Sequence, residues 1–245
     1  MTETGPRPEA EVRAGSVDLA PRPLVITIDG PAGSGKSTTA QEVARRLGLL
    51  HLDSGALYRG ITLALLRAFD GDLRVDRVDE ERIGALDLEV AWASGGPVIW
   101  LAGAQVADED LRSDEVTAHV SAVAAVPAVR SWLLGAQRAG PRFPGLVADG
   151  RDMGTVVFPD ADVKVYLEAD TGVRALRRLQ QRGVADPSPD EVMAEARKLE
   201  ARDAIDAGRE VSPLRVPAGA LVVDTSDLTF EEQIARILEL VEGAG

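Results

Sequence analysis

The pattern of hydrophobic and polar positions first becomes regular at Leu24. Residues 24–29 (LVITID) are apolar and β-branched without polar alternation, which is typical of a strand buried on both faces. A glycine-rich segment follows, and then a helical pattern from Ser37 to Leu47. Gly48 comes next, and glycine is the residue that helix C-termini favour. The ordered part of the chain therefore opens with a strand–loop–helix unit.

Short apolar runs and helical patterns continue to alternate along the chain. The further apolar runs lie at 49–52, 145–149, 162–167 and 220–224. The further helical patterns lie at 54–69, 114–139, 171–182, 189–207 and 229–242. Capping boxes at Ser188–Glu191 and Thr229–Glu232 support the last two helices. This alternation predicts an α/β fold of three layers, in which helices cover both faces of a five-stranded parallel sheet.

One stretch breaks the alternation. Residues 88–103 hold two apolar runs around Ser94-Gly-Gly-Pro97, which is typical of a β-hairpin. We expect 70–112 to form an insert packed on one side of the sheet. Residues 1–22 are rich in Pro, Gly, Glu and Arg and lack the basic and apolar regions of a secretory signal. We therefore expect a disordered tail before one folded unit, 23–245.

Composition narrows the partners and the chemistry. The 245 residues contain 27 Lys and Arg against 40 Asp and Glu, a net charge of −13, which argues against nucleic-acid polymers and anionic membranes. No apolar run approaches the length of a membrane span, so a cytoplasmic location is expected. The absence of cysteine excludes disulfides and thiolate chemistry. The two histidines, His51 and His119, are interpreted as structural.

Residues 30–37 (GPAGSGKS) fit the pattern G-x-x-x-x-G-K-[ST] between a buried strand and a helix. The glycines let successive N–H groups point at phosphate oxygens, and the helix presents the positive end of its dipole. Lys36 can reach the β- and γ-phosphates, and Ser37 can ligate Mg²⁺. A nucleoside triphosphate site is predicted at Gly30, Pro31, Ala32, Gly33, Ser34, Gly35, Lys36, Ser37 and Thr38.

Other polar segments lie where a parallel sheet places its ligands, beyond the carboxyl ends of strands. Arg59 in the segment DSGALYR is a candidate phosphate ligand. Arg151 and Asp152 follow the strand at 145–149. Asp149 either holds Mg²⁺ through water or caps the turn before Arg151.

Two arginine clusters lie on the last helices before the final strand. Arg202, Asp206 and Arg209 are spaced to share one helix face, where they form either a surface ion-pair ladder or part of a ligand site. Arg174, Arg177 and Arg178 make a second basic face. In an acidic chain such clusters suggest a polyanion site, and their helices are candidates for a closing lid.

Together, the segments ITIDGPAGSGKST, LDSGALYR, VADGRDMGTVVFPDA and EVSPL resemble bacterial cytidylate (CMP) kinases, from about Leu24 to the C-terminus. The resemblance implies a monomeric enzyme that transfers the γ-phosphoryl group of ATP to CMP or dCMP with Mg²⁺. It also implies that the insert at 70–112 binds the nucleoside monophosphate and that 170–187 forms a short helical lid.

The resemblance further implies a role for each polar group. The CMP site is implied to comprise Ser54, Tyr58, Arg59, Ser121, Arg130, Arg151, Asp152, Arg202 and Asp206. In this set Arg59 and Arg151 hold the CMP phosphate. Cytosine is read by Ser121, Arg130 and Asp152, and the pentose is contacted by Arg202 and Asp206. The phosphates are also reached by Arg209 and Arg178, and the catalytic set is Lys36, Arg59, Arg151 and Arg209.

This chemistry needs no protein base. The nucleophile is a phosphate oxygen of CMP, which is largely dianionic at neutral pH because its second pKa is about 6. Arginines and Mg²⁺ supply positioning and charge neutralisation, and lid closure excludes water. Two alternatives stay open. One is another small kinase, acting on UMP or a coenzyme precursor, and the other is a switch that hydrolyses nucleotide.

Overall fold

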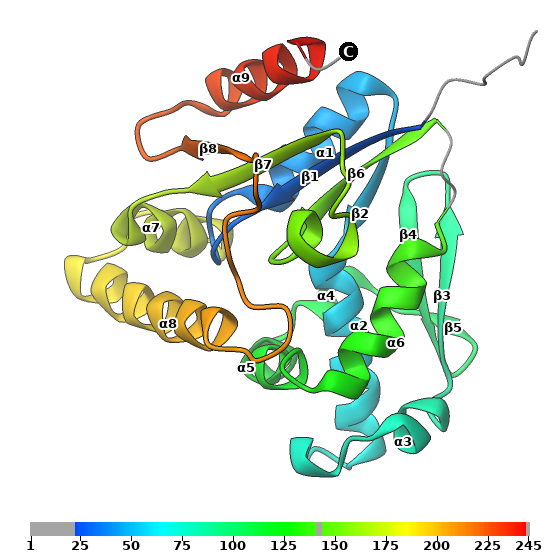
Figure 1. Ribbon diagram of the computed structural model, residues 1–245. Helices are drawn as coiled ribbons and strands as arrows, with labels where there is room; N and C mark the ends of the chain where they lie inside the picture. The colour runs from blue at the N-terminus through cyan, green and yellow to red at the C-terminus, as the bar shows by residue number, and fades with distance from the viewer. Residues whose placement is uncertain (1–22, 141–143, 244–245) are drawn as a thin grey trace, which may run out of the picture.

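The computed structural model describes residues 23–140 and 144–243, so the predicted tail at 1–22 lies outside the described residues. A central sheet of five strands, all parallel, runs through the molecule in the order β2-β6-β1-β7-β8 (Figure 1). Its strands are β1 (Leu24–Asp29), β2 (Leu50–Asp53), β6 (Gly145–Gly150), β7 (Val163–Glu168) and β8 (Leu221–Asp224). This confirms the predicted five-stranded parallel sheet.

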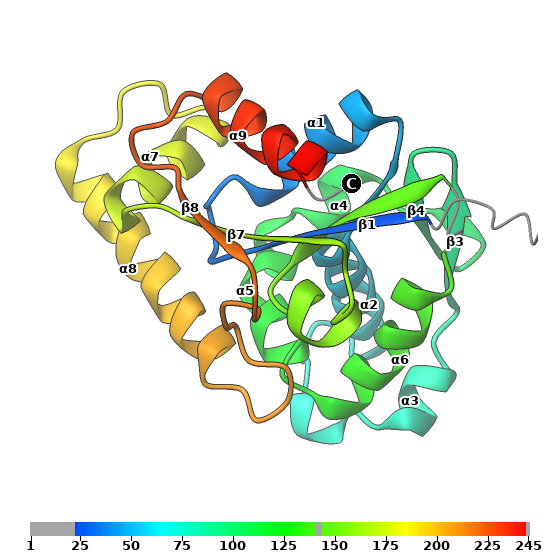
Figure 2. The same cartoon turned by 45° about the horizontal axis from the view of Figure 1, so that its top comes forward.

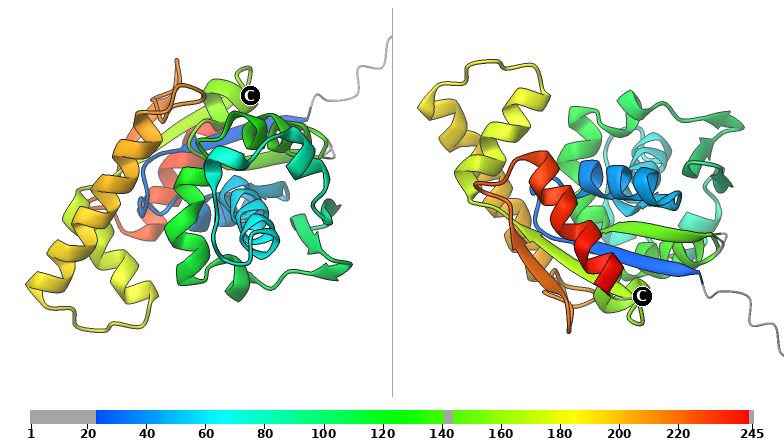
Figure 3. Two further views of the ribbon diagram at one scale, coloured as in Figure 1. Left: turned by 90° about the horizontal axis from the view of Figure 1, so that it is seen from below. Right: turned by 90° about the horizontal axis from the view of Figure 1, so that it is seen from above.

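Helices cover both faces of the sheet (Figures 1 and 2). One face packs against α1 (Lys36–Leu47) and α9 (Phe230–Gly243). The other face packs against α2 (Ser54–Ala68), α5 (Asp114–Val123) and α6 (Pro127–Arg138). The antiparallel pair α7 (Thr171–Gln181) and α8 (Pro189–Ala207) projects from one side of the molecule (Figure 3). None of the helices in the described ranges is long and apolar enough to cross a bilayer.

The single helix predicted over 114–139 is wrong. The chain forms two helices, α5 and α6, separated at Val126, whose backbone is extended. Pro127 is the cause, because its ring disfavours helical geometry in the preceding residue and suits the first position of a new helix. The break matters for the site, since Ser121 and Arg130 belong to different helices that meet at one cavity.

The hairpin expected at 88–103 is present and belongs to a separate antiparallel sheet. Its strands are β3 (Leu88–Ala93), β4 (Gly96–Leu101) and β5 (Ala104–Gln105). Short helices flank it: η1 (Val75–Arg77), α3 (Glu80–Gly84) and α4 (Asp108–Leu111). The hairpin packs closely on the main sheet, because a Cβ at Gly96 would stand 2.1 Å from the carbonyl oxygen of His51.

Replacing Gly96 by alanine is expected to lower the free energy of unfolding by about 1–3 kcal/mol, since φ is +136° there and the added carbon meets backbone. Urea unfolding measures the change. Gly95→Ala is the matched control, because a Cβ at Gly95 points into open space. Equal stability of the two variants would contradict this docking of the hairpin.

Candidate active site

A cavity of about 610 Å³ lies at the carboxyl ends of β1, β2 and β6, between α8 and the insert side of the molecule. Its lining, counted over the described residues, holds nine Lys and Arg side chains against five Asp side chains. The cavity is therefore cationic within a chain of net charge −13. Such a local excess of positive charge favours phosphorylated ligands.

The phosphate loop joins β1 to α1 at one end of the cavity. Gly33 and Gly35 have positive φ values of 76° and 86°, which lets the loop curl. Lys36 is buried and donates to the carbonyl oxygen of Pro31 at 2.8 Å. Burial, and next the charge of Arg151, lower the pKa of Lys36 to about 7. A bound phosphate would offset both effects, because it supplies the missing negative charge.

Asp149 at the end of β6 links the phosphate loop to β2. Its Oδ2 accepts from the Ser37 hydroxyl at 2.6 Å, and its Oδ1 lies 2.8 Å from His51 Nε2. Asp149 therefore holds the Ser37 hydroxyl and the His51 ring on one carboxylate. Hydroxyl and carboxylate oxygens are donors that Mg²⁺ prefers, so the pair fits this ion. Across the described residues, no group of three or more His, Asp or Glu gathers as a metal cluster.

His51 was interpreted as structural, and the structure places it at the cavity wall beside Asp149. Burial lowers the pKa of His51, but the hydrogen bond and charge of Asp149 outweigh it and raise the pKa overall. The Nδ1 atom of His119 lies 2.9 Å from the carbonyl oxygen of Glu115 in its own helix. The contact between His51 and Asp149 could not be inferred from the sequence, because the two residues lie on different strands.

The start of α2 supplies the next groups. Asp53 caps the helix by accepting from the N–H of Ala56 at 2.9 Å, and the Ser54 hydroxyl donates to the backbone carbonyl of Asp149 at 2.7 Å. Arg59 is buried and donates to the carbonyl of Leu111 at 3.1 Å and to Thr117 Oγ1 at 2.8 Å. Burial, and next the charge of Arg112, lower the pKa of Arg59 to about 10. Arg59 is thus held from the insert and from α5.

The residues implied to read cytosine line the same cavity. Arg130 and Asp152 form an ion pair, and both side chains are at least nine-tenths buried. The Arg130 guanidinium also lies 5.2 Å from the centre of the Tyr58 ring, and Ser121 lines the same cavity. The backbone after Asp152 is held by hydrogen bonds to Asp29.

Asp29, at the end of β1, accepts from the N–H groups of Met153 and Gly154, each at 2.8 Å. These residues open a π-helical turn, η2 (Met153–Val157), that the sequence did not predict. Burial raises the pKa of Asp29 to about 6. Its two hydrogen bonds therefore set the backbone that carries Asp152.

Asp206 on α8 gathers the remaining arginines. Arg151 Nε donates to its Oδ2 at 2.8 Å, and Arg209 pairs with its Oδ1. The alternative that these residues form an ion-pair ladder on the surface is wrong, because Asp206 is 1% exposed. Arg209 is not on the shared helix face that was expected, since α8 ends at Ala207. Burial, and next Arg151, lower the pKa of Arg202 to about 9, so this cation lacks full compensation.

The predicted basic face of α7 is wrong in part. Arg177 and Arg178 line the cavity, and Arg178 pairs with Glu195 at 3.0 Å. Arg174 is buried and turned toward α8 and the phosphate loop instead. Residues three and four positions apart on a helix share a face only approximately. The packing of α8 against α7 decides which of these arginines reach the cavity.

Sequence reasoning missed several residues of the cavity wall. Arg112 follows α4 and pairs with Asp108 at 2.8 Å, and Asp53 and His51 also line the cavity. Arg112 stands in no motif. Its place could be inferred only from the contact between the insert and α2.

A phosphate loop at the end of a parallel strand, in one cationic cavity with a buried Arg130–Asp152 ion pair, is typical of the class of phosphate-loop nucleotide kinases. Comparison with known sequences specifies the family. A profile of the cytidylate kinase family matches residues 26–243, and the chain belongs to that family.

Individual cytidylate kinases are similar in sequence to this chain over most of its length. Cytidylate kinase of Mycolicibacterium paratuberculosis is 45% identical over 225 residues, which cover 89% of this chain and 95% of that protein. Cytidylate kinase of Bordetella bronchiseptica is 44% identical over 218 residues, which cover 88% of this chain and 93% of that protein.

ATP binding at pH 8 is expected to take up about one proton, because Lys36 titrates near 7 in the free protein and a bound phosphate restores its usual pKa. Calorimetry in buffers of different ionisation enthalpy measures this uptake, which should fall as the pH is lowered to 6. Lys36→Met should abolish it. The same uptake in that variant would assign the proton to another group.

Proposed function

We infer that this chain transfers the γ-phosphoryl group of ATP to CMP or dCMP, forming ADP and CDP or dCDP. One observation carries this assignment. The phosphate loop and the buried Arg130–Asp152 pair line one cavity, and the other arginines of that cavity are only partly balanced by carboxylates. A donor triphosphate and an acceptor monophosphate would together supply the missing negative charge.

The chemistry of Asp152 and Arg130 supports cytosine as the acceptor base. Cytosine carries an exocyclic amino group that donates hydrogen bonds, and an aspartate is a suitable acceptor for it. Uracil presents an oxygen at that position, which a carboxylate would repel. Arg130 donates where the base has acceptors, while its stacking near Tyr58 keeps its guanidinium in place.

The reaction follows from charge and position. A CMP phosphate oxygen attacks the γ-phosphorus and ADP leaves, without removal of a proton from the acceptor. In this proposal Arg59 and Arg151 hold the acceptor phosphate, while Lys36 and Arg209 stabilise charge on the transferring group. Mg²⁺ would be held by Ser37 and Asp149 together with the nucleotide, and it supplies further charge neutralisation when bound.

The ends of the site are assigned to two segments. The insert at 70–112 contributes Arg112 and the carbonyl that holds Arg59, which supports its role in binding the monophosphate. The lid at 170–187 is extended to α8, because that helix carries Arg202 and Asp206. The protein is proposed to act as a cytoplasmic monomer without nucleic-acid or membrane partners, in keeping with its acidic composition.

Purified protein with Mg-ATP is expected to release ADP rapidly only when CMP or dCMP is added, because the cavity must hold an acceptor oxygen. A coupled ADP assay with a panel of nucleoside monophosphates makes the measurement. Equal ADP release without an acceptor would identify a nucleotide-hydrolysing switch. Faster turnover with UMP than with CMP would identify a different nucleotide kinase.

Asp152→Asn is expected to raise KM for CMP roughly 10- to 100-fold and to change KM for ATP less than about 3-fold, because it removes a charged hydrogen bond at the base end. Steady-state kinetics with each substrate varied in turn measures both. Asp160→Asn, at an exposed position after the same turn, is the control. Equal losses for both substrates would refute the assignment of Asp152 to the base.

A further inference from the structure

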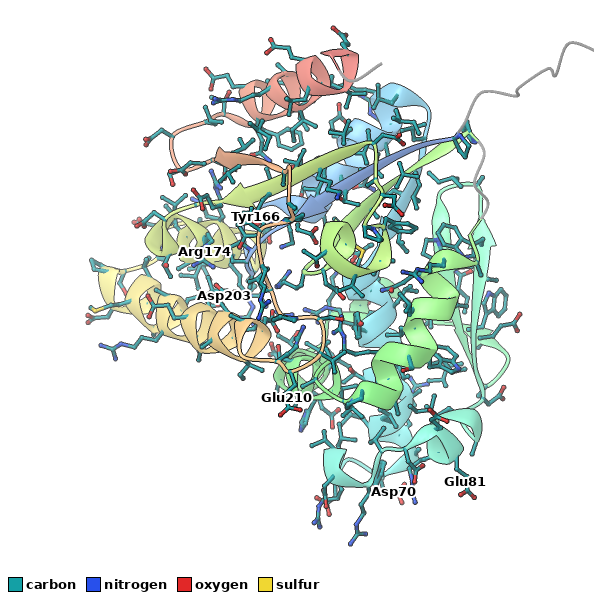
Figure 4. All side chains as sticks on the ribbon, in the orientation of Figure 1. Asp70, Glu81, Tyr166, Arg174, Asp203 and Glu210 are labelled. Carbon is teal, nitrogen blue, oxygen red and sulfur yellow. The ribbon has the colours of Figure 1, made fainter. Side chains whose placement is uncertain are left out.

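Both backbone groups of Ala32 in the phosphate loop are bonded to side chains of the helical pair α7–α8. The N–H of Ala32 donates to Asp203 Oδ1 at 2.8 Å, and its carbonyl accepts from Arg174 Nη1 at 2.9 Å. Arg174 Nη1 also donates to Asp203 Oδ2 at 2.5 Å. The loop, α7 and α8 therefore close one ring of hydrogen bonds. Figure 4 shows Arg174 and Asp203 on these two adjacent helices.

Arg174 is itself held firmly. Its Nε donates to the carbonyl of Ala169 at 3.1 Å, and its Nη2 donates to Thr171 Oγ1 at 2.9 Å. The side chain of Arg174 is buried, and a Cβ added at Gly33 would stand 3.3 Å from the Cβ of Arg174. With four hydrogen bonds on one planar guanidinium, the position of Arg174 is determined from several directions.

The carboxylate of Asp203 requires this partner. An unpaired carboxylate beside a phosphate loop would repel the triphosphate, and Arg174 neutralises it within hydrogen-bond distance. The charge of Asp203 also reaches β7, where burial, and next that charge, raise the pKa of Tyr166. Tyr166 lies beside the pair in Figure 4.

The ring joins the two halves of the proposed site. Ala32 follows Pro31, whose carbonyl receives Lys36, while Asp203 lies next to Arg202 on α8. The donor loop and the pentose-contacting residues thus share one rigid link. Phosphoryl transfer depends on the separation of reacting atoms, and a misplacement of about 1 Å can cost roughly 100-fold in rate.

We propose that Arg174 and Asp203 are a positioning pair, which fixes the phosphate loop relative to α8 and so sets the alignment of donor and acceptor. The proposal rests on the proposed function. Neither side chain needs to touch a substrate for this role. The pair acts through Ala32 on one side and through Arg202 and Asp206 on the other.

The test compares Arg174→Met and Asp203→Asn with wild type in CMP-dependent ADP formation. We expect kcat to fall roughly 10- to 100-fold, with KM for CMP changed less than about 3-fold, because the alignment of donor and acceptor is lost while the ground-state binding of CMP is kept. Arg174→Lys should restore part of kcat, since its ammonium can still pair with Asp203. The double variant should lose little more than the worse single variant, as members of one unit do.

Controls separate alignment from folding. Arg197→Met and Glu200→Gln remove the same charges at exposed positions of α8 and should leave kcat unchanged. Every variant is assayed well below its own melting temperature. If Arg174→Met does not fold, Asp203→Asn carries the test, because asparagine keeps an acceptor for the Ala32 N–H.

Three results would contradict the proposed positioning role. The first is a wild-type kcat in variants that fold but have a lowered melting temperature. The second is a rise in KM for CMP at constant kcat, and the third is an additive loss of kcat in the double variant. Failure of the proposed function is a separate result, because wild type would then show no CMP-dependent ADP formation at all.

Discussion

The structure depends on the burial of positive charge that the protein itself only partly neutralises. Lys36 and Arg59 are buried and Arg202 is partly buried at one end of the sheet, and burial lowers the pKa of each. Asp152 pairs with Arg130 and Asp206 pairs with Arg151, and these ion pairs reduce the repulsion between the cations when no ligand is bound. Phosphate groups are suitable ligands for such a site, because they supply the negative charge that the side chains of the site lack.

The fold concentrates this charge by its topology. Parallel strands bring the segments after β1, β2 and β6 to one edge, which places the phosphate loop, Ser54 and Arg151 together. The second half comes from α8, far along the chain, and Arg174 and Asp203 tie that helix to the loop. Asp29 completes the frame, since it fixes the turn that bears Asp152.

Local signals predicted what depends on local sequence. The strands, the phosphate loop and the capped helices followed from periodicity and from glycine and proline placement, although Pro127 was not used as a helix boundary. The gathering of Arg130 with Asp152 required the family resemblance. The side chains of Arg174, His51 and Arg112 could not be placed from sequence, because their partners lie on distant segments.

A structure of the complex with CMP and a non-transferable ATP analogue tests the central claim most directly. The account predicts that the CMP phosphate lies against Arg59 and Arg151, with cytosine at Asp152 and the triphosphate over Lys36. The buried cations would then each have an anionic partner. Phosphates bound away from these residues, or a base lodged at the phosphate loop, would contradict the account.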